Sequence, residues 1–476
     1  MPKFMIEYSP AQWNAPAGGV ATSWATPYGG LHVQTPENLI GPSFTPAVNN
    51  FFFRNAELRT RPAFKQLLPG PDGANFILGC GSFLSRNQVW HTFCMTPRGL
   101  FQLKTNAFAE TAAGRNPWVF LGGGPLGTAP VNWIVLNGIL YYSNGGVHLS
   151  AWDGAASQAV RDVNFSGLNP SQPAGPGGQT ASATVGAFFL GELDNHIITA
   201  YTNESVNGRR SITVGWSNSG FNPVASAITT LWASATAYGV GTRILDSNGN
   251  VQVAVLGGTS GGSQPVWNRD LNVTTADNTV LWANAGPNGG FPTNLGTIGA
   301  TFDPGVSVNA GFNDFLDVPD IITGLMTLGR EGFVFRQNGI THMTPTGKGV
   351  LPFDFNHMWS SQNGIGNVYP FTIAQYGNTG IFISFEQIYQ ITPGGLQPIG
   401  GGARDAIMTD LSNATGSPKA SIDRGFNLGY TFLHYHLRIP LSNGTRSYIF
   451  SLEENNWTSW TETNVWPTGQ SNECWV

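Results

Sequence analysis

Large apolar and polar side chains alternate along much of this chain, which is the pattern of half-buried β-strands. In the segment 133–154, such runs are joined through Asn137-Gly138, a dipeptide that favours the tight turn of a β-hairpin. The segments 332–343 and 431–460 repeat this strand–turn–strand arrangement. No stretch has a convincing helical periodicity, so the pattern predicts strands almost throughout.

These strand-rich blocks recur roughly every 40–50 residues, a length that fits one four-stranded propeller blade. A single blade would leave an apolar sheet face exposed, and packing blades into a ring buries those faces. A β-sandwich would rarely need 476 residues in one unit. We therefore predict an all-β fold, a β-propeller of about six blades, near residues 73–121, 130–165, 183–222, 321–352, 368–400 and 416–462.

The blade pattern is interrupted twice, and the interruptions divide the chain. Residues 1–70 lack the pattern and are predicted to form an N-terminal arm. Residues 231–286 are predicted to form a small β module inserted between blades, because exposed loop tips tolerate such insertions. The first half of the propeller would then span residues 71–230, and the second half would span residues 287–476.

Charged residues are scarce, at 10% of the chain against about 25% in an average soluble domain. The net charge is −5, and the lysines and arginines are scattered rather than clustered. Tight binding of nucleic acid needs basic stripes, so this function class is disfavoured, whereas a wall that DNA slides past is compatible with the charge. A surface this poor in charge also suits a subunit that buries its outside against partners.

Residues that could bind a metal or act as a nucleophile lack the spacing or the neighbouring elements that these functions need. Cys80, Cys94 and Cys474 lack CxxC spacing, which argues against a zinc site and a disulfide framework and favours buried thiols. The stretch 258–262 matches the G-x-S-x-G nucleophile motif, but the residues after it cannot start a helix, so a turn is favoured. We expect no metal, no cofactor and no catalytic residue.

Two further classes are disfavoured, membrane proteins and propeller enzymes. No apolar run approaches the roughly 18 residues of a membrane span, and the first residues do not resemble a signal peptide, so no stable membrane insertion is expected. Propellers host glycosidases and sialidases, but the chain has no S-x-D-x-G-x-x-W box of the sialidase type. We therefore predict that the protein is not an enzyme.

His434, His436 and Arg438 alternate along one predicted strand, so their side chains would share one face. Two histidines at this spacing can bind zinc, but a third ligand is needed and none is evident nearby. We expect a polar stripe that faces either solvent or an interface.

The predicted inserted module is rich in aromatic residues. Trp232, Tyr238, Trp267 and Trp282 could form a sugar-binding face, because flat rings stack on the apolar faces of sugars. The alternative is that these rings are the core of a small domain, which needs large side chains to bury enough area. The sequence favours the core, and the four residues remain candidate sugar-stacking residues.

Several stretches resemble one family. The stretch 49–64 is similar to its N-terminal segment, with Leu58, Arg61, Pro62 and Phe64 matching and Ala63 replacing the usual glycine. The stretches 214–223, 310–347 and 363–407 resemble later segments in the same order, the last with Gly366, Pro370 and Ile399-Gly400 in the expected places. The family comprises the β-propeller tail hub or nozzle proteins of short-tailed bacteriophages, also called head-completion or head-stabilisation proteins.

This resemblance implies a role in the virion tail rather than in metabolism. It implies a homo-oligomer, a hexameric ring below the portal and adaptor rings, assembled in the host bacterial cytoplasm. The ring would close the head, hold a tail plug or needle, and let DNA pass transiently and without sequence specificity during ejection. Tail fibres or tailspikes would dock on its outside.

Two alternatives use the same propeller scaffold. One is a carbohydrate-binding or receptor-binding propeller, which would show closer blade-to-blade identity with repeated aromatic pockets. The other is a glycosidase-type propeller enzyme, which would need two carboxylates about 5–9 Å apart. Sequence alone does not show which acids approach one another.

Overall fold

The computed structural model describes strands within the first 64 residues and most of the chain that follows. The described residues are 30–31, 44–45, 51–54, 57–60, 68–71, 77–85, 88–122, 126, 129–146, 149–154, 161–163, 185–204, 208–217, 230–240, 242–268, 273–287, 309–317, 320–348, 351–359, 364–427 and 430–462. The chain divides into two compact units, residues 1–64 with 369–471 and residues 65–368 with 472–476, which are treated separately below.

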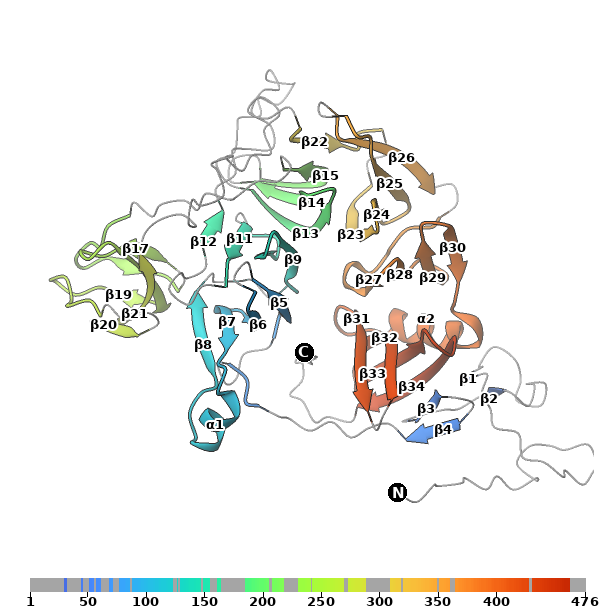
Figure 1. Ribbon diagram of the computed structural model, residues 1–476, viewed down its shortest axis with the longest axis horizontal. Coiled ribbons are helices and arrows are strands. Elements are labelled where there is room, and N and C mark those ends of the chain that lie inside the picture. Colours follow the sequence, from blue (N-terminus) through green and yellow to red (C-terminus); the bar gives the residue numbers. More distant parts are fainter. Residues whose placement is uncertain are drawn as a thin grey trace, which may run out of the picture. The chain divides into compact units, whose positions relative to one another are not determined.

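Apart from the inserted module, the described part of residues 65–368 contains four antiparallel sheets of four strands each (Figure 1). The first sheet has β5 (Gly79–Leu84), β6 (Trp90–Thr96), β7 (Gly99–Leu103) and β8 (Trp118–Gly122), with α1 (Ala107–Ala112) before β8. The second has β9 (Asn132–Leu136), β10 (Ile139–Ser143), β11 (Leu149–Trp152) and β12 (Arg161–Val163). The third has β13 (Val185–Leu193), β14 (His196–Glu204), β15 (Gly208–Trp216) and β22 (Gly311–Asp314). The fourth has β23 (Ile322–Leu328), β24 (Glu331–Arg336), β25 (Ile340–Pro345) and β26 (Phe353–Trp359).

The other unit contains two more sheets of the same kind. The fifth has β27 (Ala374–Tyr376), β28 (Thr379–Ile383), β29 (Ile388–Thr392) and β30 (Gly395–Pro398), with η3 (Pro370–Thr372) before it and η4 (Gly401–Ala403) and α2 (Arg404–Ser412) after it. The sixth has β31 (Lys419–Asn427), β32 (Tyr430–Leu441), β33 (Gly444–Ser451) and β34 (Asn456–Glu462). The N-terminal segment adds the parallel pair β1 (Gly30–Leu31) and β2 (Phe44–Thr45) and the hairpin β3 (Phe51–Arg54) and β4 (Glu57–Thr60). Strands β1 and β3 lie beside β34.

Within each unit, successive sheets pack face to face, because alternate side chains of each strand point to opposite faces and the facing sides are apolar. The core between the first and second sheets includes Phe83, Phe93, Leu140 and Trp152. Corresponding cores join the second sheet to the third, the third to the fourth, and the fifth to the sixth. Six blade-type sheets that follow one another along the chain confirm the predicted fold class, an all-β propeller of about six blades.

The inserted module is a separate set of strands between β15 and β22. It contains β16 (Ala237–Tyr238), β17 (Arg243–Leu245), β18 (Asn250–Leu256), β19 (Gly258–Thr259), β20 (Thr274–Asp277) and β21 (Val280–Pro287), with a four-stranded sheet in the order β17-β18-β21-β20. Strands β15 and β22 pair with each other, so the third sheet is completed by residues that follow the module. The sequence pattern alone does not indicate this last pairing.

The sequence predicted one hairpin turn correctly but did not predict the helices. Asn137 and Gly138 both have positive φ, at 54° and 70°, as the predicted turn between β9 and β10 requires. The helix α2 was not predicted, because it buries only a short apolar set, with Ile407 and Leu411 four residues apart. No helix among the described residues is long and apolar enough to cross a membrane.

One expectation about the cysteines is wrong. Cys80 is disulfide-bonded, whereas spacing along the chain predicted buried thiols. Cys94 is buried and lies opposite Cys80 in the β5–β6 register, and Cys474 lies outside the described residues. Linear spacing does not show which distant residues a cysteine meets in the folded chain.

Candidate functional site

The four aromatic residues of the inserted module do not form an exposed face. Tyr238, Trp267 and Trp282 are buried in the core of the module, and the side chain of Trp282 has no exposed area. The rings of Tyr238 and Trp267 meet Trp282 edge-on, with centroids 4.9 and 6.0 Å away. Trp232 packs against this core and is half-buried.

Asp277 organises these rings. Its Oδ2 accepts hydrogen bonds from Nε1–H of Trp232, at 2.8 Å, and of Trp282, at 3.0 Å. Its Oδ1 accepts from the backbone N–H of Gly261, at 2.7 Å. The carboxylate is buried at the end of β20, so it holds two indoles and the loop after β19 in place.

This geometry corrects the candidate sugar-stacking set. Tyr238, Trp267 and Trp282 offer no free ring face, so a sugar cannot stack on them. Their positions match the alternative in which large rings supply the core of a small domain. Trp232 is the one member of the set with a partly accessible ring, and a sugar-binding role for it stays a prediction.

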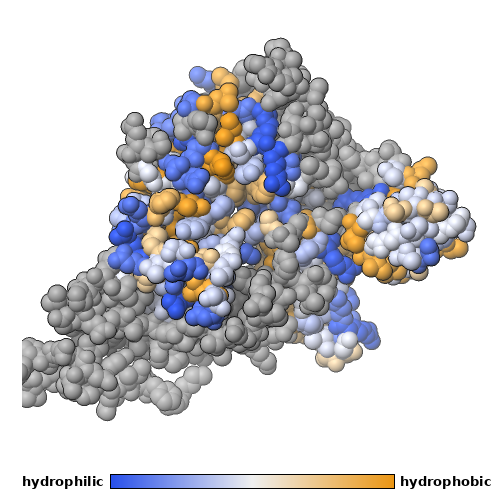
Figure 2. All heavy atoms as spheres, turned by 180° about the vertical axis from the view of Figure 1, so that it is seen from behind, coloured by the Kyte–Doolittle hydropathy of each residue, from blue (hydrophilic) through white to orange (hydrophobic). Residues whose placement is uncertain are grey.

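The surface of the inserted module instead carries exposed aliphatic side chains (Figure 2). Val266 is 96% exposed, and Leu256 and Val240 are also exposed. Aliphatic side chains lack the flat ring on which a sugar stacks.

Two polar motifs of the module are turns. Ser260, in the G-x-S-x-G stretch, is buried, and its Oγ–H donates to the carbonyl oxygen of Ala233 at 2.7 Å. Asp246 accepts from the backbone N–H groups of Asn248 and Asn250, both at 2.8 Å, which is the geometry of an Asx turn. Among the described residues, no group of three His, Cys, Asp or Glu side chains could hold a metal ion.

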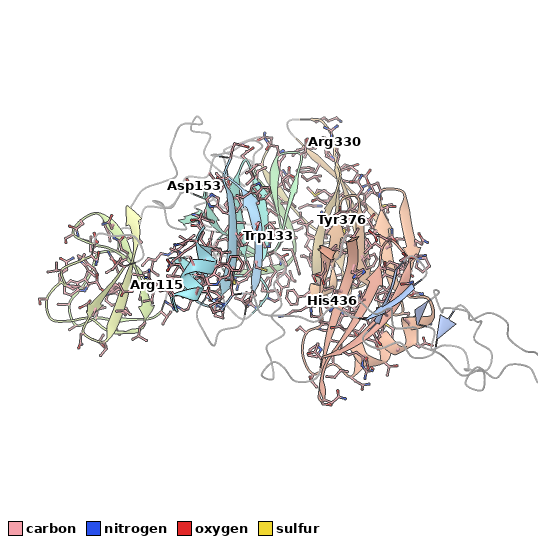
Figure 3. All side chains as sticks on the ribbon, turned by 60° about the horizontal axis from the view of Figure 1, so that its bottom comes forward. Arg115, Trp133, Asp153, Arg330, Tyr376 and His436 are labelled. Carbon is pink, nitrogen blue, oxygen red and sulfur yellow. The ribbon has the colours of Figure 1, made fainter. Side chains whose placement is uncertain are left out.

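The sixth sheet contains a buried charged cluster. His434, His436 and Arg438 share one face of β32, as predicted, but all three are buried rather than facing solvent. Figure 3 shows His436 on this sheet. Across the register, β31 adds Ser421 and Asp423 to the same face. The opposite face of β32 is apolar and belongs to the core between the fifth and sixth sheets.

Asp423 is the anion of this cluster. Its Oδ2 lies 2.8 Å from His436 Nδ1 and 3.9 Å from Arg438 Nη2. Its Oδ1 accepts from Ser421 Oγ–H at 2.7 Å, and Arg438 Nη1–H donates to the same hydroxyl at 3.3 Å. Arg438 therefore meets the carboxylate both by charge and through Ser421.

The protonation states follow from burial and charge. Burial, together with the positive Arg438, lowers the pKa of His436 to about 4, although the hydrogen bond to Asp423 opposes this shift. The imidazole is therefore neutral at pH 7 and can donate its Nδ1–H to Asp423. Burial acts to raise the pKa of Asp423, but its hydrogen bonds and the positive charge nearby outweigh this and lower it. Asp423 thus stays ionised beside Arg438.

A second buried arginine lies in the fourth sheet and was missed by sequence reasoning. The side chain of Arg336 is fully buried, with Nη2 3.4 Å from Nδ1 of His357. Nε2 of His357 lies 2.9 Å from Oδ2 of Asp317. Burial lowers the pKa of Arg336, and the two nearby acids, Asp320 and Asp317, oppose that shift. No local motif marks this arginine, because its neighbours come from other parts of the chain, His357 from β26 and the two acids from the connection before β23.

Gly366 shows why one residue of the family-like stretch 363–407 is glycine. A Cβ at this position would lie 2.5 Å from the carbonyl oxygens of Arg336 and Gln337 and from the amide of Gly339. These atoms belong to the β24–β25 turn and cannot yield as a flexible side chain can. The segment after β26 therefore passes this turn at a distance that only glycine permits.

Each of the three polar networks is built around a buried charged group. Asp277, Asp423 and Arg336 are all buried, so these three charged groups are not themselves exposed to a substrate. Ser421 donates to Asp423 rather than to a histidine, so this cluster does not align a nucleophile with a base. What these networks can do chemically is fix strands and turns in place.

Comparison with known proteins leaves the chain without assigned relatives. No protein-family model and no curated protein matches it. Among solved structures it is similar to Hsv2 of Kluyveromyces lactis, at 10% identity over 82% of this chain and 98% of that chain, with a TM-score of 0.27. A tricorn protease structure matches at 10% identity over 86% of this chain and 37% of that chain, with a TM-score of 0.19. Similarities this weak carry no argument about function.

Proposed function

We propose that this chain is a structural component of a short-tailed bacteriophage tail. It would form the hub or nozzle ring below the portal and adaptor, close the head and continue the DNA ejection channel. A plug or needle would fill the ring until ejection, and fibres or tailspikes would dock outside. The chain would be assembled in the host cytoplasm and would act as a building block of the virion, not as an enzyme.

The order of the family-like stretches along a chain of blade-type sheets carries the proposal. The stretch 49–64 covers the β3–β4 hairpin, 310–347 covers β22 to β25, and 363–407 runs from before η3 into α2. These stretches combine strands with the connections between sheets. Gly366 adds a position where the backbone has room only for glycine.

Charge and burial support the proposal independently. Only 10% of the residues are charged and the net charge is −5, so a wall built from this chain would not grip phosphates. The buried networks around Asp277, Asp423 and Arg336 hold strands and turns together. Both features suit a passive conduit.

Electron microscopy of reconstituted particles tests the proposal. The purified full-length chain is mixed with the portal–adaptor complex of its virion and imaged in negative stain, next to the chain alone. We expect six copies to cap the complex and leave a central channel. The chain alone serves as a reference. Monomers in that sample would not contradict the proposal, because such rings can close only on the portal–adaptor complex.

A deletion of residues 231–286 provides the matched control. Strands β15 and β22 pair with each other outside the inserted module, so the third sheet keeps its strands without it. We expect the shortened chain to cap the complex as the full chain does. Particles of the full chain that ignore the portal–adaptor complex would contradict the tail-hub function, and a glycan screen would then test the carbohydrate-binding alternative.

A further inference from the structure

Two buried histidines hold equivalent places in two different sheets. His91 lies at the start of β6 and His196 at the start of β14, and each strand is the second of its sheet. In the antiparallel registers, His91 is opposite Phe83 and His196 is opposite Leu193. Phe83 and Leu193 belong to the cores shared with the following sheet, so both imidazoles face that sheet.

His91 contacts an aromatic ring of the second sheet. Its ring meets Trp152, the last residue of β11, edge-on, with centroids 5.1 Å apart and planes inclined by 68°. Gln102 Nε2 lies 3.0 Å from Nδ1 of His91, and Ser85 Oγ lies 3.2 Å from Nε2. A neutral imidazole with its proton on Nε2 satisfies both, accepting from Gln102 and donating to Ser85. His91 is only 7% exposed.

His196 repeats this contact in the third sheet. Its ring meets Phe353, the first residue of β26 in the fourth sheet, edge-on, with centroids 5.1 Å apart and planes inclined by 73°. Its Nδ1–H donates to the carbonyl oxygen of Ser217. His196 is 3% exposed, so neither histidine has bulk water around its ring.

The charged groups near these two rings are acidic. Asp153, next to Trp152 in the second sheet, acts on His91, and Asp194 and Glu192 act on His196 from its own sheet. The contacting residue of the fourth sheet, Phe353, does not titrate. Burial lowers the pKa of both histidines, and these acids oppose the shift only in part. Both rings are therefore neutral at pH 7.

We propose that His91 and His196 form a pair of acid-responsive contacts, which release the second sheet from the first and the fourth sheet from the third. Protonation gives His91 a second N–H, on Nδ1, which points at the amide nitrogen of Gln102 rather than at an acceptor. At both sites the new charge is buried against an aromatic ring, and hydrating it requires the sheets to part. Strands β6 and β14 start at the same end of their sheets, so both openings occur at that end.

Hydrogen exchange at two pH values tests this inference in the full chain. Exchange, corrected for its intrinsic pH dependence, is followed by mass spectrometry at about pH 7.5 and at about pH 5, which span the ordinary titration of histidine. We expect faster exchange at the lower pH in β11 and β26, by up to about tenfold per pH unit for each histidine. The double variant His91→Gln, His196→Gln should lose this acceleration.

Two further measurements separate the switch from simple destabilisation. The variant His342→Gln is the matched control, since His342 stacks on Phe333 of its own sheet and faces Glu331 at 3.1 Å. It should keep the acid response of the wild type. In addition, NMR titration of the imidazole protons should place the midpoints of His91 and His196 below pH 6.5, and exchange should accelerate as the pH falls from about 6.5 towards those midpoints.

The inference does not depend on the tail-hub function. An acid acceleration that persists unchanged in the double variant would overturn it. Uniform acceleration in all six sheets would also overturn it, because global acid unfolding would then explain the result.

Discussion

Asp277 in the inserted module and Asp423 in the sixth sheet are both buried carboxylates, yet their donors differ in kind. Asp277 accepts from two indole N–H groups and one backbone amide, none of which titrates. Asp423 lies against His436 and Ser421 and is 3.9 Å from Arg438. One carboxylate is held by neutral dipoles and the other by a charged and a titratable partner.

The networks around Asp277 and Asp423 should respond differently to mutation and to acid. Neutral donors stabilise a buried anion without a counter-ion, so the module needs only local geometry. A buried ion pair costs desolvation on both partners, so removing one partner leaves the other charge poorly compensated. The network of Asp423 also includes a histidine that is neutral at pH 7, so acid changes its charge.

The largest effect is expected from Asp423→Ala. The substitution takes the carboxylate away from Arg438 and from His436, which are both buried, and should cost about 3–5 kcal/mol of unfolding free energy. Urea unfolding of the variant and the wild type measures it. Ser421→Ala is the control, because it removes only the hydroxyl between Arg438 and Asp423 and should cost about 1 kcal/mol. Equal losses in the two variants would show that the ion pair is not the main source of stability in this cluster.

A smaller and more local effect is expected from Asp277→Asn. The amide keeps an oxygen for the indoles of Trp232 and Trp282, but its NH₂ group faces the N–H of Gly261, so about 2–3 kcal/mol should be lost. Hydrogen exchange should accelerate in β16 to β21 and not in the six sheets. Asn278→Gly, which removes one exposed hydrogen bond to the Thr259 carbonyl and tolerates the positive φ of 55° at this position, should leave exchange nearly unchanged. Acceleration throughout the chain would contradict the independence of the inserted module.

The strands could be predicted from the sequence more readily than the contacts between residues distant in the chain. Alternation and turn dipeptides such as Asn137-Gly138 predicted the strands, because these are local properties. The shared face of His434, His436 and Arg438 also follows from alternation alone. Their burial does not, since it depends on what covers the sheet.

The candidate site was harder to predict for the same reason. The aromatic residues of the module are compatible with a sugar-binding face or with a core, and only the arrangement around Asp277 separates the two. Arg336 carried no signal, because its partner His357 is distant in the chain, and the resemblance that marked Gly366 did not show which turn it packs against. The disulfide bond of Cys80 was likewise beyond what spacing could indicate.

Acid should also destabilise the sixth sheet. The unfolding free energy lost per pH unit should be about half of the loss expected for Asp277→Asn. The pKa of His436 is about 4 when folded and 6.5 ordinarily, so its neutral form contributes stability in full above pH 6.5. That contribution falls by about 1.4 kcal/mol per pH unit as the pH drops from 6.5 towards 4. The amide of His436→Asn can still donate to Asp423. In this range, the slope of its unfolding free energy against pH should be smaller than that of the wild type by the contribution of one proton. Urea unfolding at several pH values measures the slope, and an unchanged slope would contradict the buried neutral imidazole.

The smallest effect is expected from Trp232→Phe, which tests what remains of a sugar-binding face. Phenylalanine keeps a ring against the core but loses the indole N–H to Asp277, so about 1 kcal/mol of stability should be lost. The other three aromatic rings are buried, so we expect no glycan retention by the wild-type chain on an array of bacterial surface sugars. Retention by the wild type that is lost in Trp232→Ala, with the module still folded by hydrogen exchange, would restore the carbohydrate-binding hypothesis. It would place the contact on the one ring of the set that the core leaves partly open.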